Sequence, residues 1–150
     1  MVGIGYDSHR FAAGRRLILG GVEIEHELGL TGHSDADVLT HAVIDAVLGA
    51  AGSGDIGTMF PPDDERWHDA DSIDMLRTAV GTVAGMIVNV DATLICEQPR
   101  LGPYRAEMER VLGDVTSARV SVKATSNEGM GWIGRGEGIA CIAVASVQSE

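Results

Sequence analysis

The segment Ile139–Val147 is apolar on both of the faces that a β-strand would present, apart from Ser146. A strand of this kind has to be covered on both sides, whereas a strand with one polar face can border water. We therefore predict that Ile139–Val147 is a central strand, which needs partner strands from elsewhere in the chain. Three further segments have strand character: Val2–Phe11, Ile87–Cys96 and Arg119–Thr125.

A hairpin and a long helix are predicted between the first two of these strands. Leu17–Ile24 contains two short apolar runs around a Gly-Gly pair, which favours a tight turn. Gly29–His33 is predicted to be a loop. Ser34-Asp35-Ala36-Asp37 resembles a capping box, so a helix should follow it to about Ala51, where the next residue is a glycine.

Two more helices and two long loops are predicted in the rest of the chain. Ser72 is a candidate cap for the second helix, and Pro103 suits the first turn of a third helix that should end before Gly113. The segments Gly54–Asp71 and Ser126–Gly138 are rich in glycine and polar residues, so we predict two functional loops there.

The predicted order is strand, hairpin, helix, helix, strand, helix, strand, strand. Long connections of the βαβ type combined with a hairpin indicate an α+β fold. We predict a mixed β-sheet with helices packed on one face. The sequence has no internal repeat or linker, so residues 1–150 should form a single compact domain.

The charge balance argues against one class of partner. The net charge is −11, from 22 acidic and 11 basic residues, and Lys123 is the only lysine. A nucleic-acid-binding protein needs a basic face, so we predict no nucleic-acid partner. A small phosphorylated ligand remains compatible, because metal ions and one or two arginines can neutralise it locally.

The lack of a recognisable targeting signal and the small number of cysteines favour the bacterial cytoplasm. No apolar run approaches the roughly 20 residues of a membrane span, and the N-terminus lacks the pattern of a signal peptide. We therefore predict no membrane partner. Cys96 and Cys141 both lie in apolar runs, so we expect buried, reduced thiols.

One aspartate and two histidines form a candidate metal site. Asp7 and His9 would project from the same face of the first strand, because strand side chains alternate. His41 lies one turn into the predicted helix, on the same face as Asp37. Three protein ligands with a vacant position are typical of catalytic zinc, although each pair of residues alone would more often be structural.

Two polar loops could hold a phosphorylated polyol. The acidic, proline-containing stretch Asp55–Asp64 offers carboxylates and amides for hydroxyl groups, or it is a solvated turn. Thr125-Ser126-Asn127-Glu128 follows a predicted strand and leads into glycines, an arrangement suited to phosphate. Glu128 could hold Mg²⁺ together with substrate phosphates. Alternatively this is a flexible hairpin in which Arg135 simply pairs with Glu137.

Taken together, these motifs resemble the 2-C-methyl-D-erythritol 2,4-cyclodiphosphate synthase family over almost the whole chain. The order and spacing of the matching stretches make the resemblance specific. These stretches are Gly5–Phe11, His33–Asp37, Gly54–Gly57, Phe60–Asp64 and Gly134–Ala140.

The resemblance implies a lyase of the non-mevalonate isoprenoid pathway that works as a homotrimer with active sites between subunits. Such enzymes convert 4-diphosphocytidyl-2-C-methyl-D-erythritol 2-phosphate to the cyclic diphosphate and CMP. The resemblance implies Zn²⁺, or another divalent transition metal, at Asp7, His9 and His41, and Mg²⁺ or Mn²⁺ at Glu128. It assigns transition-state stabilisation to His33 and Ser126.

The remaining implied contacts fall into two sets. The expected substrate contacts are Ser8, Ser34, Asp55, Ile56, Gly57, Phe60, Asp63, Asp64, Thr125, Asn127, Trp132 and Arg135. The expected nucleotide contacts are Cys96, Pro99, Arg100, Leu101 and Gly102, which the adjacent subunit contributes together with its Thr125 and Ser126.

The residue types fit this chemistry, because the attacking 2-phosphate and the departing CMP are both stable anions. The main task is to neutralise charge and to orient the two ends of the substrate. Two alternatives are kept. A zinc-dependent phosphohydrolase would release inorganic phosphate, and a non-catalytic trimeric nucleotide- or metal-binding protein would turn nothing over.

Overall fold

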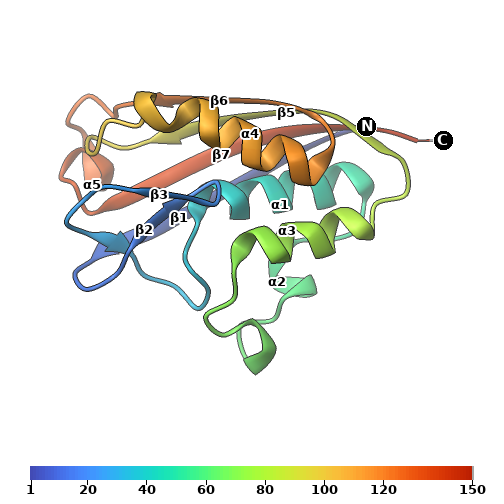
Figure 1. Ribbon diagram of the computed structural model, residues 1–150, viewed down its shortest axis with the longest axis horizontal. Helices are drawn as coiled ribbons and strands as arrows, with labels where there is room; N and C mark the ends of the chain where they lie inside the picture. Colours follow the sequence, from blue (N-terminus) through green and yellow to red (C-terminus); the bar gives the residue numbers. More distant parts are fainter. Residues whose placement is uncertain (150) are drawn as a thin grey trace.

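A five-stranded sheet forms the centre of the protein in the computed structural model, which describes residues 1–149. The strand order is β4-β1-β7-β5-β6 (Figure 1). The strands are β1 (Val2–Ala12), β4 (Gly29–Leu30), β5 (Met86–Ile95), β6 (Arg119–Thr125) and β7 (Gly138–Gln148). β7 is antiparallel to both of its neighbours, β1 and β5, while β5 and β6 are parallel. The predicted mixed sheet and central strand are therefore confirmed.

The predicted hairpin is also confirmed. β2 (Leu17–Leu19) and β3 (Val22–Ile24) pair as a small separate sheet, and both glycines between them have positive φ. The loop predicted over Gly29–His33 is wrong at its start, because β4 pairs with the end of β1. Two residues are too few to give a strand pattern that can be recognised in the sequence.

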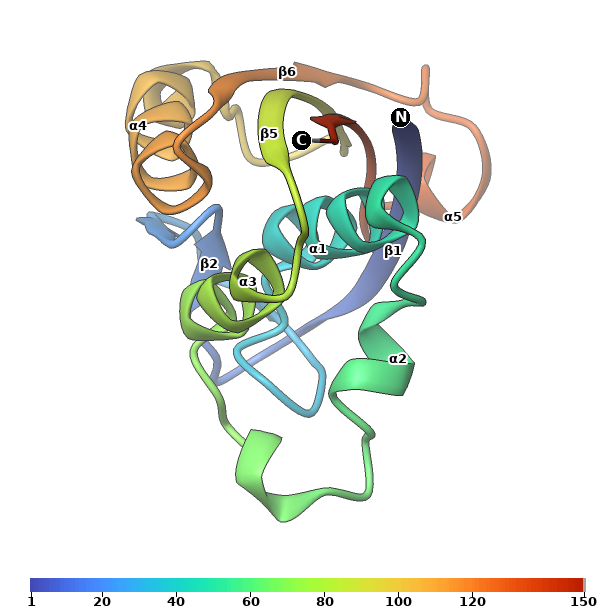
Figure 2. The same ribbon diagram turned by 90° about the vertical axis from the view of Figure 1, so that its right-hand side faces the viewer.

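Three helices lie on one face of the sheet, as predicted (Figures 1 and 2). They are α1 (Val38–Ala51), α3 (Ser72–Gly81) and α4 (Arg105–Thr116). α1 contacts β1 and β7 directly, and α3 packs against α1. α1 is buried along most of its length, since it lies between the sheet and α3.

Short helical turns occur inside the segments that were predicted as loops. They are α2 (Ile56–Met59), the 3₁₀ turn η1 (Glu65–Trp67) and α5 (Gly131–Gly134). A further 3₁₀ turn, η2 (Gly102–Tyr104), contains Pro103 and directly precedes α4, so the third helix starts after Pro103 rather than at it. Such turns are too short to show helical periodicity in a sequence.

The predicted helix caps are each displaced. α1 is capped by Asp37 rather than Ser34, because the Asp37 carboxylate accepts the Thr40 N–H at 2.9 Å. α3 is capped by Asp71, which accepts from Ile73 N, so Ser72 is the first residue of that helix.

The predicted end of the third helix is also wrong. α4 continues through Gly113 to Thr116 and ends at Ser117, which has a left-handed backbone. A glycine inside a helix costs only about 1 kcal/mol relative to alanine. Burial of Met108 and Leu112 in the core offsets such a cost.

Two glycines allow β1 and α1 to approach closely. A Cβ atom on Gly5 would lie 1.9 Å from the Ala42 carbonyl oxygen, and one on Gly3 would lie 2.1 Å from that of Ala46. Only glycine fits such a contact between backbones. Continuing along the same face of β1, the next side chains are Asp7 and His9, which therefore meet the first turn of α1.

The opposite face of the sheet carries exposed apolar side chains. They come from three neighbouring strands and are Val2, Ile4, Tyr6, Met86, Val88, Ile142 and Val144. We call this set the open-face patch. Its largest exposures are 72% for Val2 and 70% for Ile4.

None of the helices within residues 1–149 has the length and apolar character needed to cross a membrane.

Candidate metal centre and substrate loops

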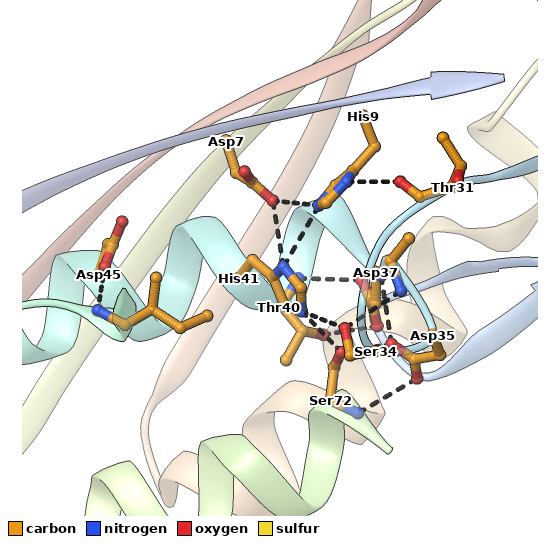
Figure 3. A network of polar contacts seen from close by, with 12 residues as sticks. Asp7, His9, Thr31, Ser34, Asp35, Asp37, Thr40, His41, Asp45 and Ser72 are labelled. Carbon is orange, nitrogen blue, oxygen red and sulfur yellow. Dashed lines mark hydrogen bonds and ion pairs between the residues drawn. The ribbon is translucent and has the colours of Figure 1, made fainter. Parts of the chain in front are cut away.

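Asp7, His9 and His41 converge on one point between β1 and α1 (Figure 3). His9 Nε2 lies 2.8 Å from Asp7 Oδ2, and His41 Nδ1 lies 3.2 Å from the same oxygen. The two imidazole nitrogens are 3.3 Å apart. Among residues 1–149, this is the one group of three or more potential ligands that could hold a metal ion. The structure thus brings together the three residues that the sequence analysis selected.

The polar atoms of this group suit a cation. Asp7 Oδ2 is buried, and no donor in residues 1–149 approaches it with hydrogen-bond geometry, although both imidazoles are adjacent. His9 Nδ1 lies 2.9 Å from the Thr31 carbonyl oxygen, which can only accept, so this nitrogen carries the proton and Nε2 presents a lone pair in the neutral ring. Carboxylate and imidazole are common zinc ligands.

The same proximity shifts two pKa values. Burial alone would raise the pKa of Asp7, but the adjacent His41 and His9 lower it below its usual value. Burial alone would lower the pKa of His9, but contact with Asp7 raises it. Both shifts show that this position favours positive charge next to Asp7.

Asp37 fixes the start of α1, one turn before His41. Its buried carboxylate accepts hydrogen bonds from the backbone N–H groups of Gly20, Gly21 and Thr40 and from the Thr40 hydroxyl, at 2.7–2.9 Å. Burial raises the pKa of Asp37. These bonds join the β2–β3 turn to the helix that presents His41.

A cavity of about 160 Å³ adjoins Asp7, His9 and His41, which we call the metal group. We call this cavity the metal-side cavity. Its lining combines predicted site residues from β1, from the region around the start of α1 and from the α2 loop with four residues that were not predicted. Its lining is His9, His33, Ser34, His41, Ile56, Gly57, Phe60, Pro61, Pro62, Trp67 and Met75. The loop before α1 and the loop around α2 therefore meet at the metal group.

The loop around α2 is held by contacts that the sequence analysis missed. Asp45, one turn after His41 on α1, accepts the Ile56 N–H at 2.7 Å. Burial raises the pKa of Asp45. The ring of Trp67 stands edge-on against Phe60, with centroids 4.6 Å apart. These contacts link segments that are far apart in the sequence, so no local pattern announces them.

The acidic residues of this loop do not all face the cavity. Asp55 caps α2 by accepting the Thr58 N–H at 2.7 Å. Asp63 and Asp64 line a neighbouring hollow, and Asp64 pairs with Arg66 at 2.6 Å. Asp55, Asp63 and Asp64 are therefore absent from the lining of the metal-side cavity among the residues that the structure describes.

The predicted nucleotide residues form a second hollow of about 470 Å³ at the ends of β5 and β6. It is lined by Cys96, Glu97, Pro99, Arg100, Leu101, Gly102, Pro103, Ala124, Thr125 and Ser126. Within the described part of the chain, this nucleotide-side hollow shares no lining residue with the metal-side cavity. The two predicted halves of the site are thus distinct surfaces of one chain.

Glu97, which the sequence analysis did not select, orders the loop after β6. Its carboxylate accepts the backbone N–H groups of Asn127 and Gly129, at 2.9 and 3.2 Å. Between them, Glu128 is exposed and has a left-handed backbone. Glu128 does not belong to the metal group formed within residues 1–149.

A third hollow, of about 200 Å³, also has His9 in its lining and includes two further predicted residues, Ser8 and Trp132. Arg135 instead pairs with Glu137 at 2.8 Å, which is the alternative that the sequence analysis left open.

Comparisons with known proteins agree with this arrangement. Residues 1–148 match a family model described as the YgbB family. A protein of Symbiobacterium thermophilum named 2-C-methyl-D-erythritol 2,4-cyclodiphosphate synthase is 54% identical over 98% of this chain and 98% of its own length.

Solved structures are also similar. A CDP-bound form of 2C-methyl-D-erythritol-2,4-cyclodiphosphate synthase has a TM-score of 0.88 and 32% identity, covering 99% of this chain and 100% of its own. The bifunctional IspDF from Campylobacter jejuni has a TM-score of 0.92 and 37% identity, covering 96% of this chain but only 41% of that longer chain.

Proposed function

The chain belongs to the YgbB family of 2-C-methyl-D-erythritol 2,4-cyclodiphosphate synthases, and we propose how its own residues serve that reaction. It is an enzyme of isoprenoid biosynthesis that converts 4-diphosphocytidyl-2-C-methyl-D-erythritol 2-phosphate to the cyclic diphosphate and CMP. An oxygen of the 2-phosphate forms a bond to the β-phosphorus, and the bond from that phosphorus to the CMP oxygen breaks. Water is not consumed.

The convergence of Asp7, His9 and His41 beside the metal-side cavity carries this proposal. We assign Zn²⁺, or another divalent transition metal, to this group and Mg²⁺ or Mn²⁺ to Glu128. Bound divalent ions would neutralise and polarise the substrate phosphates. The buried Asp7 oxygen and the two imidazoles support a transition metal, while an exposed lone carboxylate suits an ion that keeps most of its water.

The chain positions the two ends of the substrate separately. We propose that the erythritol part lies against the α2 loop, with Ile56, Gly57 and Phe60 around it, and that His33 and Ser34 face the phosphates. Ser8, Asp63 and Asp64 would complete these contacts from the neighbouring hollows, and Asp55 would do so from the start of α2. Holding both ends supplies most of the orientation that ring closure needs.

We propose that the cytidine part occupies the nucleotide-side hollow of a neighbouring subunit. Thr125 and Ser126 would contact the substrate from that subunit, while Asn127, Trp132 and Arg135 would supply further substrate contacts from the loop between β6 and β7. A related structure is titled as a form with CDP bound, which supports a nucleotide ligand. The separation of the two hollows in one chain supports a site completed between copies.

We propose a homotrimer whose subunits meet through the open-face patch. Contiguous exposed apolar surface of this kind marks association surfaces in soluble proteins. We also propose that the enzyme works in the cytoplasm, since Cys96 and Cys141 are both free thiols and buried.

The direct test is phosphorus NMR of the cytidylylated erythritol 2-phosphate with purified protein, Zn²⁺ and Mg²⁺. Coupled cyclic-diphosphate resonances with CMP are expected, and they should be lost in His41→Ala but kept in His26→Ala, whose ring stands beside Phe11 and outside the lining of the metal-side cavity. Release of inorganic phosphate would favour a hydrolase, and unchanged substrate would contradict the proposed activity.

A further inference from the structure

The outer nitrogen of His41 faces two serine hydroxyls. His41 Nε2, which points away from Asp7 and His9, lies 2.9 Å from Ser72 Oγ and 3.0 Å from Ser34 Oγ (Figure 3). His41, Ser34 and Ser72 are all buried. Whether Nε2 or Nδ1 carries the proton decides whether Nδ1 can act as a ligand.

The proton of the Ser72 hydroxyl is already committed. Ser72 Oγ donates to the Asp35 carboxylate, and the other Asp35 oxygen accepts the Ser72 backbone N–H at 3.1 Å. The Asp37 N–H also donates to Asp35, at 3.2 Å. Both carboxylate oxygens thus face backbone donors that cannot accept, so Asp35 acts as an acceptor only.

A serine hydroxyl has one proton and spare lone pairs. Because the Ser72 proton goes to Asp35, Ser72 Oγ must accept from its other neighbour, His41 Nε2. Nε2 then carries the ring proton, and the Nδ1 lone pair points at the Asp7–His9 group. Ser34 Oγ accepts the Ala36 N–H at 3.2 Å, which leaves it able to share the Nε2 proton.

We propose that Asp35 and Ser72 are positioning residues that hold His41 in the Nε2–H tautomer and so make Nδ1 available to a metal ion. The relay runs from a carboxylate through a hydroxyl to an imidazole. Outer partners of this kind orient the ring and increase its basicity as a ligand. The predicted tautomer of His41 does not depend on the proposed metal site. The predicted effect on Zn²⁺ affinity rests on that proposed site.

A purely structural role for these residues predicts a different result. Asp35 and Ser72 also tie the loop before α1 to the start of α3, so their loss could affect stability alone. Asp71→Ala is the matched control, since Asp71 caps the same end of α3 by accepting the Ile73 N–H and has no contact with His41. It should lower the melting temperature without changing His41.

The test has two readouts. The first is the protonation of the His41 ring nitrogens in metal-free, ¹⁵N-histidine-labelled protein, with the signals assigned by their loss in His41→Ala. The second is the Zn²⁺ dissociation constant from competition with a chromophoric chelator. The wild type should show Nε2–H. Ser72→Ala should mix the tautomers and weaken Zn²⁺ binding about 10- to 100-fold.

Two further variants make the test independent of one substitution. Asp35→Asn should act in the same direction as Ser72→Ala, and the double variant should bind Zn²⁺ no more weakly than Ser72→Ala alone, since both residues act through one relay. Ser72→Thr, which keeps the hydroxyl, should restore the Nε2–H tautomer. If Ser72→Ala does not fold, the tautomer of His41 in the wild type and in Asp35→Asn still tests the relay.

The outcomes separate the relay from the metal site. An Nδ1–H tautomer in the wild type, or unchanged tautomer and affinity in both Ser72→Ala and Asp35→Asn, would overturn the relay. An Nε2–H wild type that mixes tautomers in Ser72→Ala but binds no Zn²⁺ would support the relay and overturn only the proposed metal site.

Discussion

Glu128 and the Asp7–His9–His41 group differ in how tightly the protein surrounds them. Glu128 is exposed, so Glu128→Gln should leave the fold and Zn²⁺ binding unchanged. The Mg²⁺ concentration for half-maximal turnover should rise about tenfold, which corresponds to a loss of about 1.4 kcal/mol of binding. Turnover titrated with Mg²⁺ in buffer freed of trace metals measures this. Glu25→Gln, at another exposed position, is the control, and full turnover of Glu128→Gln at low Mg²⁺ would contradict the role.

Asp7 supplies the charge of the metal group. With free Zn²⁺ at about 100 times its dissociation constant, binding should stabilise the wild type by about 2.7 kcal/mol. Asp7→Asn should abolish this gain, because the carboxylate to which both imidazoles are adjacent is lost. Thermal unfolding with and without Zn²⁺ measures the gain. Asp69→Asn, on an exposed turn, should keep it. An equal Zn²⁺ shift in Asp7→Asn would exclude Asp7 as a ligand.

The metal ligands could be predicted because local rules place them. Strand alternation puts Asp7 and His9 on one face, and helical spacing puts His41 one turn after Asp37 in the predicted helix. The residues that orient these ligands could not be predicted in the same way. Asp35 meets Ser72 across 37 positions of sequence, and such a contact depends on how helices pack rather than on local pattern.

At the level of elements, the distance between β1 and α1 determines whether the ligands meet. Gly5→Ala would place a methyl group 1.9 Å from the Ala42 carbonyl oxygen. Because that distance is far below van der Waals contact, α1 and its His41 must move. We expect a loss of about 3 kcal/mol or more in stability and weaker Zn²⁺ binding. Denaturant unfolding and chelator competition measure both effects.

Gly81→Ala is the matched control for this substitution. The position has open space for a Cβ atom and lies at the end of α3, so alanine should be neutral or slightly stabilising there. A Gly5→Ala protein as stable as Gly81→Ala would show that α1 can withdraw from β1 at little cost.

The strands were easier to predict than the helix ends. β6 has the predicted bounds, β1 is one residue longer at its end, and β5 and β7 differ from their predicted bounds by one residue at each end, because burial on one or both faces leaves a strong pattern. The starts of α1 and α3 are set by which acidic side chain accepts a free N–H, and several candidates are adjacent in the sequence, whereas the end of α1 at Ala51 has its predicted place before Gly52. Asp37 and Asp71 are selected by three-dimensional contacts.

For the whole molecule, the open-face patch should determine assembly. The wild type should sediment with a mass near three times 15.7 kDa. Ile4→Glu adds a charge at the patch to a chain that already carries −11, so it should dissociate the trimer. Thr78→Glu, on the exposed side of α3, should not. A monomeric wild type or a trimeric Ile4→Glu protein would contradict assembly through this patch.

A site shared between subunits allows two inactive variants to complement each other. His41→Ala removes the metal half, and Ser126→Asp places negative charge in the nucleotide half, so each protein alone should be inactive. After dissociation and joint reassembly at equal amounts, each site draws its halves at random from the two variants. About a quarter of the sites should then combine two intact halves in a heterologous ring. Recovery of about a quarter of wild-type turnover would therefore place the metal group and the nucleotide-side hollow on different chains, because a site built within one chain would recover none.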